Sequence, residues 1–282
     1  MSVLERRFLK ALEPIVACYW MTPSDAVEEY TAIGLDDPMA CYVTGRAAPL
    51  GRATAATVAS VFYNFDPRVI DEALWWDRVE PEAVLEARAR GVRRLLGRLL
   101  EDAPHDVAAA AASLREAAAG CRPEGRPLFA ANAALPWPEH PLEALWHGGN
   151  LLREYRGDGH IAVLVAAGLS GVEALALNVA YTGWNRDFFY LLRGWPQEAY
   201  DAAHQTLRAR GFLDDENAIT DAGMKFREML EIETDRATAT VFQGIGPARA
   251  TDLLAVIEPI GQMVVERKGV SRSVSRIGGT AG

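Results

Sequence analysis

The sequence lacks the features that mark several common classes of protein. No apolar run approaches the roughly 20 residues that span a bilayer; the longest are segments such as 161–168. Charged residues interrupt the apolar positions of the N-terminus, which has neither the apolar stretch nor the small-residue cleavage site of a signal peptide. We therefore expect a cytoplasmic protein that does not insert into membranes.

Positive charge and cysteine are also scarce. The 282 residues carry a net charge of -9, whereas nucleic acids and anionic membranes are bound mainly through clustered Lys and Arg. This balance disfavours a general nucleic-acid binder. Three widely spaced cysteines, Cys18, Cys41 and Cys121, suit reduced, buried thiols better than a disulfide framework or a zinc site.

Several chemical motifs are missing from the sequence. It has no Gly-x-Gly-x-x-Gly after an expected strand, no Gly-Lys-Ser/Thr loop and no Gly-x-Ser-x-Gly elbow. It also lacks the His-x-x-x-His, Glu-x-x-His and paired-cysteine spacings that hold metal ions. Nucleotide-binding folds, serine hydrolases and metal sites are therefore not expected, and the cofactor, if one is used, stays unknown.

What the sequence does contain is helical periodicity over most of its length. Half of the residues are hydrophobic (50%), which is ample for a core, and we expect a mainly α protein. We divide it into a helical part, 1–120, a Pro-rich strap, 121–140, a second lobe, 141–270, and a flexible tail, 271–282. Phe129, Leu135 and Trp137 make the strap too apolar to swing freely in solvent.

The second lobe contains the pattern of a winged helix-turn-helix. A helix over 196–210 should end at Gly211, because glycine readily adopts the left-handed conformation that closes helices. Two short strands, 212–213 and 218–219, should form the wing. Thr220 or Asp221 should then cap a long charged helix.

These residues carry a family resemblance. The segment 207–237 resembles the end of the recognition helix, the wing and the next helix of MarR-like regulators, at Leu207, Gly211, Leu213, Ile219, Thr220, Gly223, Glu231, Thr234 and Asp235. The resemblance implies a MarR-like winged helix in the C-terminal half. The whole chain also resembles an uncharacterised actinobacterial helix-turn-helix-like family, through the phrases GRAAPLG, FYNF, RPLFAAN, LPWP, LWH and LLREYRGDGH. That resemblance brings no activity with it.

An internal similarity bears on the N-terminal half. Residues 73–96 align with 190–213, since Trp, Pro, Glu and Ala lead in each into a helix with an Arg-rich end. The alignment predicts a second winged-helix-like lobe in one polypeptide, imitating a regulator dimer. Chance matching of two helices rich in Ala and Arg explains it equally well.

The charge of the expected recognition helix opposes DNA binding. Glu198 and Asp201 lie on it, and its two arginines stand at its end. The wing tip consists of acidic residues, 214–216. If DNA is bound nonetheless, the phosphate contacts should come from Arg186, Arg193, Arg208 and Arg210.

Candidate catalytic residues lie on the helix expected over 141–156. His147 and Glu154 are seven residues apart and share a face, so they can present an imidazole and a carboxylate to one site. His160 follows an expected helix break at 157–159 and can join them. In the alternative interpretation Glu154 forms salt bridges and both histidines occupy core or boundary positions.

Candidate ligand-binding residues lie in or beside segments marked by Gly and Pro, where functional loops are common. They are Arg46, Tyr63, Asn64, Arg126, Asn132, Trp146, Arg153 and Asp158. Aromatic residues gather near the same segments and form either a wall for a flat organic ligand or ordinary core.

The leading hypothesis is therefore a protein that binds a small organic molecule, with an enzyme of specialised metabolism as one version. It would use a regulator fold that has lost DNA binding. The alternative is a MarR-like, ligand-responsive transcriptional regulator. Either a monomer or a homodimer fits the sequence.

Overall fold

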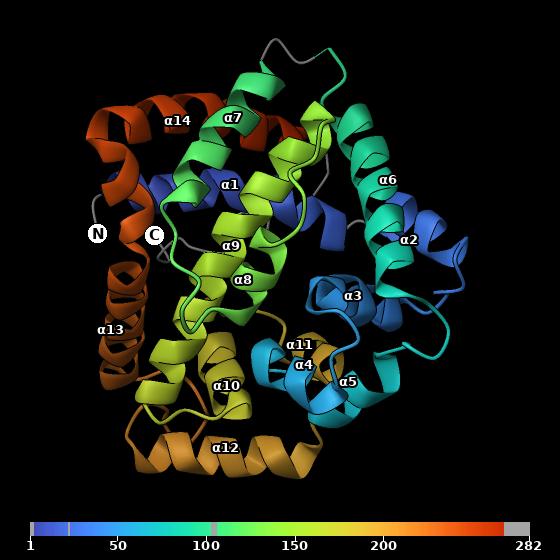
Figure 1. Cartoon of the computed structure of the whole chain (residues 1–282). Helices are drawn as coiled ribbons and strands as arrows, with labels where there is room; N and C mark the ends of the chain where they lie inside the picture. The colour runs from blue at the N-terminus through green and yellow to red at the C-terminus, as the bar shows by residue number, and fades with distance from the viewer. Residues whose placement is uncertain (1–2, 22, 103–105, 268–282) are drawn as a thin grey trace.

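The computed structural model describes residues 3–21, 23–102 and 106–267. The tail expected over 271–282 lies outside these residues. The helices of the first half are α1 (Val3–Met21), α2 (Pro23–Thr31), α3 (Pro38–Ala47), the 3-10 helix η1 (Ala48–Leu50), α4 (Ala55–Phe62), α5 (Pro67–Ala73), α6 (Pro81–Leu99) and α7 (Val107–Ala119). Those of the second half are α8 (Pro127–Ala133), α9 (Pro141–Ala166), α10 (Gly171–Thr182), α11 (Arg186–Arg193), α12 (Gln197–Ala209), α13 (Asp221–Thr238) and α14 (Thr240–Glu266). The prediction of a mainly α fold is confirmed (Figure 1).

The wing is smaller than the predicted strand pair. In the part of the chain that the structure describes, the only β pairing around it is a single antiparallel bridge between Leu213 and Ile219. The Asp214 side chain accepts hydrogen bonds from the backbone N–H groups of Glu216 and Ala218, at 3.0 and 2.8 Å. The carboxylate therefore satisfies N–H groups that a longer β-ladder would otherwise pair.

The helix ends follow the sequence signals closely. Asp66 caps α5 through the backbone N–H of Arg68, with Pro67 as the first helical residue. Thr220 caps α13 through the N–H of Gly223. Gly211 follows α12 with φ +74°, which is the left-handed conformation expected for a residue that ends a helix.

One predicted helix break is wrong. The chain continues as α9 from Pro141 to Ala166, straight through Gly157 and Gly159. The reason is packing. A Cβ at Gly159 would lie 2.5 Å from Nη1 of Arg126, so glycine makes room there for a guanidinium group.

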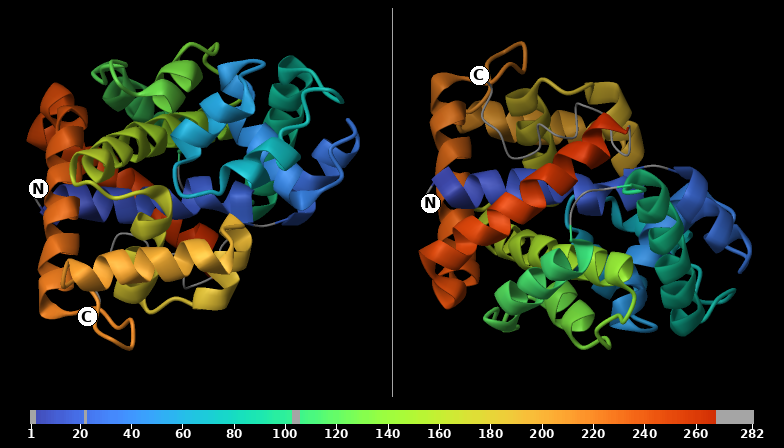
Figure 2. Two further views of the ribbon diagram at one scale, coloured as in Figure 1. Left: turned by 90° about the horizontal axis from the view of Figure 1, so that it is seen from below. Right: turned by 90° about the horizontal axis from the view of Figure 1, so that it is seen from above.

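The main core combines helices from both halves of the sequence. Helix α1 packs along α14 and α7 packs along α9, while α1 also contacts α9 and α7 also contacts α14. Figure 2 shows α1 and α14 crossing on one side of the molecule. Leu12, Leu114, Leu151 and Ile257 all belong to this one hydrophobic cluster. We call this part the body.

Helices α10 to α12, the wing and the first part of α13 form a smaller unit, which we call the helix-turn-helix lobe. Its packing depends on two small apolar clusters, one around Leu177, Leu207 and Leu230, the other around Tyr190 and Tyr200. In Figure 1, α12 runs along the edge of the molecule farthest from α14. The lobe is thus attached to the body rather than buried in it.

The lobe joins the body at the loop after α4. Tyr63 has φ +48° there, and its carbonyl oxygen would lie 1.9 Å from a Cβ at Gly171, so only glycine fits at the start of α10. The backbone N–H of Asp66 donates to the carbonyl of Arg193 at 2.9 Å. The Trp195 indole N–H donates to the carbonyl of Asn64 at 2.9 Å.

The Pro-rich strap is partly helical. Helix α8 lies within it, and Leu128 and Phe129 are buried. Asp158 of α9 accepts a hydrogen bond from the N–H of Phe129 at 2.9 Å and so caps α8 from another helix. The strap therefore packs across the protein, as its apolar residues indicate.

Two other expectations concern cysteines and membranes. Cys18 and Cys41 are buried free thiols, and Cys121 is a half-buried one. Among the described helices, none alone combines the length and the apolarity needed to cross a membrane.

Candidate ligand-binding site

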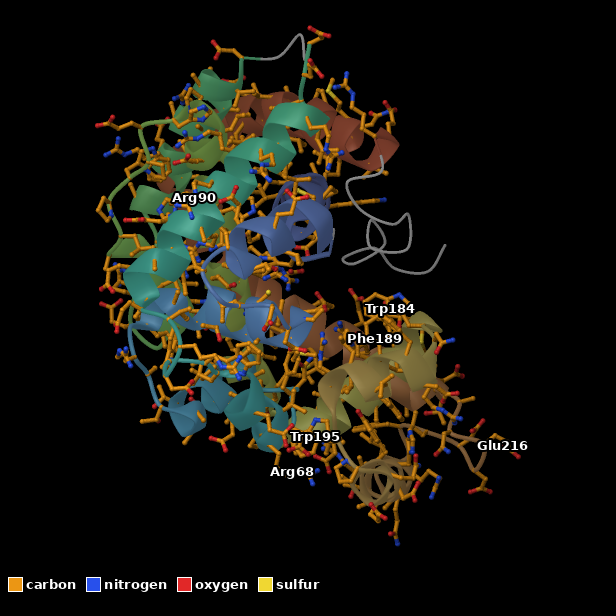
Figure 3. All side chains as sticks on the ribbon, turned by 90° about the vertical axis from the view of Figure 1, so that its right-hand side faces the viewer. Arg68, Arg90, Trp184, Phe189, Trp195 and Glu216 are labelled. Atoms are coloured by element: carbon orange, nitrogen blue, oxygen red, sulfur yellow. The ribbon has the colours of Figure 1, made fainter. Side chains whose placement is uncertain are left out.

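A cavity of about 410 Å³ lies where the helix-turn-helix lobe meets the body. Helices α1, α3, α4 and α9 line it from the body, and α10, α11 and α13 line it from the lobe. Its volume falls in the range of small-molecule sites, about 300–1,000 Å³. Figure 3 shows Trp184, one of the lining residues, on the lobe near the body, and Glu216 at the outer end of the lobe.

A buried ion pair forms part of the body side of the cavity. The Arg46 guanidinium of α3 donates to both carboxylate oxygens of Glu154 on α9, at 2.9 and 2.7 Å. Glu154 is 1% exposed. Burial by itself would raise the pKa of Glu154, but Arg46 and then Arg153 hold it below its usual range.

Arg153 extends this pair toward α1. Its guanidinium lies 3.3 Å from a carboxylate oxygen of Glu13 and 3.4 Å from one of Glu154. Arg46, Glu154, Arg153 and Glu13 thus alternate in charge across three helices. Each charge is compensated, which is what makes such a group tolerable in a site of low dielectric.

A second charged group lies on the α13 side. Glu231 accepts from Arg156 at 2.6 Å and contacts Arg227 at 2.5 Å. These arginines overcome the effect of burial and lower the pKa of Glu231 to about 2. Nearby, His160 Nδ1 lies 2.8 Å from the Thr234 hydroxyl. Burial is the main reason that the pKa of His160 is lowered to about 4.

Arg193 differs from the other four arginines that line the cavity. It is the last residue of α11, and its guanidinium carbon lies 4.2 Å from the centre of the Phe65 ring. Its Nε is buried without a hydrogen-bond partner. No carboxylate of the described residues pairs with it. Burial lowers its pKa, as expected for a buried guanidinium group without a paired carboxylate.

Aromatic rings form much of the remaining wall. Tyr42 stacks on Phe65 with a centroid distance of 5.7 Å, and Phe62 lies beside both rings. On the lobe side Trp184 stacks on Phe189 at 4.5 Å. The cavity therefore pairs apolar ring surfaces with guanidinium groups.

A family model described as a helix-turn-helix family matches residues 5–271 of the chain. The chain belongs to this helix-turn-helix family. No curated protein and no solved structure matches it. The specific MarR-like and actinobacterial resemblances stay predictions.

The cavity of this helix-turn-helix protein gathers many of the residues proposed from the sequence. The predicted site residues that line it are Arg46, Tyr63, Asn64, Arg153, Glu154 and His160. Arg193, proposed from the sequence as a phosphate contact, lines it as well. Residues distant in the chain thus meet here.

His147 lies elsewhere, outside the lining of the cavity. Its ring is buried against Trp137, with centroids 5.2 Å apart. Burial, followed by the charge of Arg88, lowers the pKa of His147 to about 4. The shared helical face with Glu154 therefore does not bring the two side chains into one site.

Four other proposed ligand-binding residues support the body of the protein. Arg126 donates to the carbonyls of Tyr155 and Ala237, and Asn132 accepts from the side chain of Asn150 at 3.2 Å. The remaining two are Trp146, whose indole N–H donates to the Val16 carbonyl at 3.3 Å, and Asp158, which caps α8. Burial raises the pKa of Asp158 to about 6.

The other three arginines proposed to contact DNA are engaged within the chain. Arg208 donates to the side chain of Asn217 at 2.5 Å, and Arg210 donates to the carbonyls of Gly168 and Ala167 at 3.2 and 3.1 Å. Arg186 pairs with its neighbour Asp187 at 3.2 Å. A helix-turn-helix protein that used these arginines on DNA would first have to release them.

Arg227, Glu231 and Tyr42 are among the cavity residues that were not proposed as site residues. Arg227 and Glu231 are four apart on α13, which is a spacing for a helical ion pair. Tyr42 is one of the aromatic residues that the sequence assigns either to a ligand wall or to ordinary core. The packing of the helices decides which helix faces meet at the cavity. No signal within one helix could therefore have shown that Tyr42, Arg227 and Glu231 lie in the same site. Within the described residues, no cluster of His, Cys, Asp and Glu is suited to a metal ion.

Proposed function

We propose that this protein binds a small organic molecule in the cavity between the body and the helix-turn-helix lobe, and that the lobe no longer binds DNA through α12. One observation carries the proposal. A cavity of about 410 Å³ with aromatic walls and guanidinium groups lies at the joint of the two parts. Such a combination of apolar surface and a few polar groups suits a ligand site.

The charges of the cavity favour binding over proton transfer. Arg46 bonds both oxygens of Glu154, and this pairing suits a carboxylate that fixes neighbouring groups in place. A catalytic role for Glu154 and His160 is the enzyme version of the proposal. It requires the ligand to reach both side chains at once.

The test uses a variant that fills the cavity. A Cβ at Gly157, which lines the cavity, would meet only a carboxylate oxygen of Glu154, at 3.7 Å. Gly157→Leu should therefore fold and occupy ligand space. Gly97→Leu is the matched control, because a Cβ there meets only Leu142 at 3.8 Å and the residue lies outside the cavity.

Ligand-observed NMR with a mixed library of small charged and neutral molecules gives the readout, together with native mass spectrometry of the purified protein. We expect bound molecules in the wild type and in Gly97→Leu, and at least tenfold weaker binding in Gly157→Leu. Equal binding in all three proteins would place the ligand elsewhere. Absence of any bound molecule in the wild type would overturn the proposal.

Family membership favours a second candidate, a ligand-responsive regulator of transcription. It requires DNA binding that weakens steeply as salt rises, because phosphate contacts release counterions. Gel-shift titration with fragments flanking the gene, at 50 and 200 mM salt, tests it. A specific, salt-dependent complex would establish this candidate in place of the loss of DNA binding.

A further inference from the structure

The charges that line the cavity do not balance one another. Among the described residues, five arginines line it: Arg46 of α3, Arg153 and Arg156 of α9, Arg193 of α11 and Arg227 of α13. Four of them lie within 4 Å of a carboxylate that also lines the cavity. Arg193 is the exception.

Its position makes this exception informative. Arg193 is placed firmly, because its carbonyl accepts from the backbone of Asp66 at 2.9 Å and its guanidinium lies over Phe65. Its Nε is buried without a partner, and no described residue forms a hydrogen bond to its terminal nitrogens. Folding alone gives no reason for a charge here, since an apolar side chain would cover Phe65 equally well.

Tyr42 gives a second, independent indication. Its ring stacks on Phe65, the ring that the Arg193 guanidinium also contacts, and its hydroxyl has no hydrogen-bond partner among the described residues. Burial would raise its pKa, but Arg46, Arg193 and Arg153 together lower it. These guanidinium groups thus favour negative charge at this end of the cavity. The hydroxyl is also a free donor for an anion.

We propose that the ligand of this cavity is an organic anion, a carboxylate or another oxyanion on an apolar body, whose charged group is bound by Arg193 with help from the Tyr42 hydroxyl. This proposal rests on the proposed function of the cavity. A guanidinium group offers parallel N–H donors that match two oxygens of one oxyanion. The rings of Tyr42, Phe62 and Trp184 then contact the apolar body.

The experiment compares acids with their neutral amides. Benzoate with benzamide, 1-naphthoate with 1-naphthamide and hexanoate with hexanamide are pairs of nearly equal size that differ in charge. Dissociation constants are measured by calorimetry for the wild type, Arg193→Met and Arg186→Met. Arg186 is the matched control, because it lies on the same helix but is exposed beside Asp187.

We expect at least one acid to bind the wild type tenfold or more tightly than its amide. This preference should vanish in Arg193→Met, persist in Arg186→Met and weaken in Tyr42→Phe. Arg193→Lys keeps the charge but loses the paired donors, so it should retain only part of the preference. Melting temperatures check folding, and Arg193→Met should melt no lower than the wild type.

The outcomes separate the two proposals. Amides that bind as tightly as acids, with Arg193→Met unchanged, would overturn the anion proposal and leave the cavity function intact. Acids that bind equally well to Gly157→Leu would place the anion outside the cavity and would contradict both proposals. Both proposals are supported if the preference for an acid over its amide is lost in Arg193→Met and kept in Arg186→Met.

Discussion

The two sides of the helix-turn-helix lobe carry opposite chemistry. On the outer side, α12 and the wing present Glu198, Asp201 and Glu216, all exposed, while Arg208 and Arg210 are engaged by groups of the chain itself. On the inner side, Arg193 and other arginines face a cavity with aromatic walls. One guanidinium group that a DNA-binding lobe would present to phosphates, that of Arg193, is thus found on the side that faces the body.

This difference teaches that a fold and its usual surface can be separated. Helix order, caps and turn residues determine the helix-turn-helix, and none of them requires a basic α12. The inner surface can then acquire a binding site while the framework stays unchanged. Three predictions test whether charged groups on the two sides contribute differently to the free energy of unfolding.

The largest effect is expected at the cavity that the inner side of the lobe faces. Glu154→Gln removes the charge that compensates Arg46 and Arg153, and a buried charge without its partner costs about 3–5 kcal/mol of unfolding free energy. Urea unfolding measures the change. Glu258→Gln is the control, because its partner Arg7 is 54% exposed and such pairs contribute about 1 kcal/mol or less. Equal losses in both variants would contradict a compensating role for Glu154.

The buried groups at this cavity should also make the stability of the protein depend on pH. The pKa of His160 is about 4 in the fold, against an ordinary value of 6.5. The unfolded chain therefore binds a proton on His160 in this window that the folded chain does not, so stability falls as the pH drops from 6.5 to 4. His147, also lowered to about 4, acts in the same direction.

His160→Asn should reduce the loss of unfolding free energy between pH 7 and pH 4 by roughly 2–3 kcal/mol. Unfolding curves at several pH values measure the slope, and NMR titration of the ring gives the pKa directly. A ring that titrates near 6.5 in the folded protein would show that the site is wetter than its packing indicates.

The smallest effect on stability is expected on the outer side. Reversing two charges on α12, Glu198→Lys with Asp201→Lys, should change the unfolding free energy by roughly 0.5 kcal/mol or less, because both residues are exposed. It should also raise affinity for random duplex DNA by about tenfold at low salt. Glu124→Lys with Glu139→Lys changes the net charge equally on exposed loops. If this control gains the same affinity for duplex DNA, the gain depends on net charge and not on the location of the lysines on α12.

Local signals in the sequence predicted much of the fold. The cap at Thr220 and the helix end at Gly211 were readable because each depends on a few neighbouring residues. Gly157 and Gly159 led to the wrong prediction of a helix break, because that prediction considered only neighbouring residues. Gly159 admits the guanidinium of Arg126, which comes from the start of α8.

The candidate site was harder to predict than the fold. Arg46 and Glu154 are 108 residues apart, so their pairing depends on how α3 and α9 pack. Arg193 was predicted as a phosphate contact because its helix belongs to the lobe. Only the attachment of the lobe to the body shows that the end of α11 faces inward.

The hydrogen bonds from Asp66 to Arg193 and from Trp195 to Asn64 have a mechanical consequence. They tie the turn between α11 and α12 to the body at two points, whereas the wing tip near Glu216 lies at the far end of the lobe (Figure 3). The turn is therefore a pivot, and the wing is the end of a lever. A rotation of the lobe that keeps both bonds but breaks those from Arg210 to the carbonyls of Ala167 and Gly168 moves the wing most and the turn least, so a distance label on the wing would detect it best.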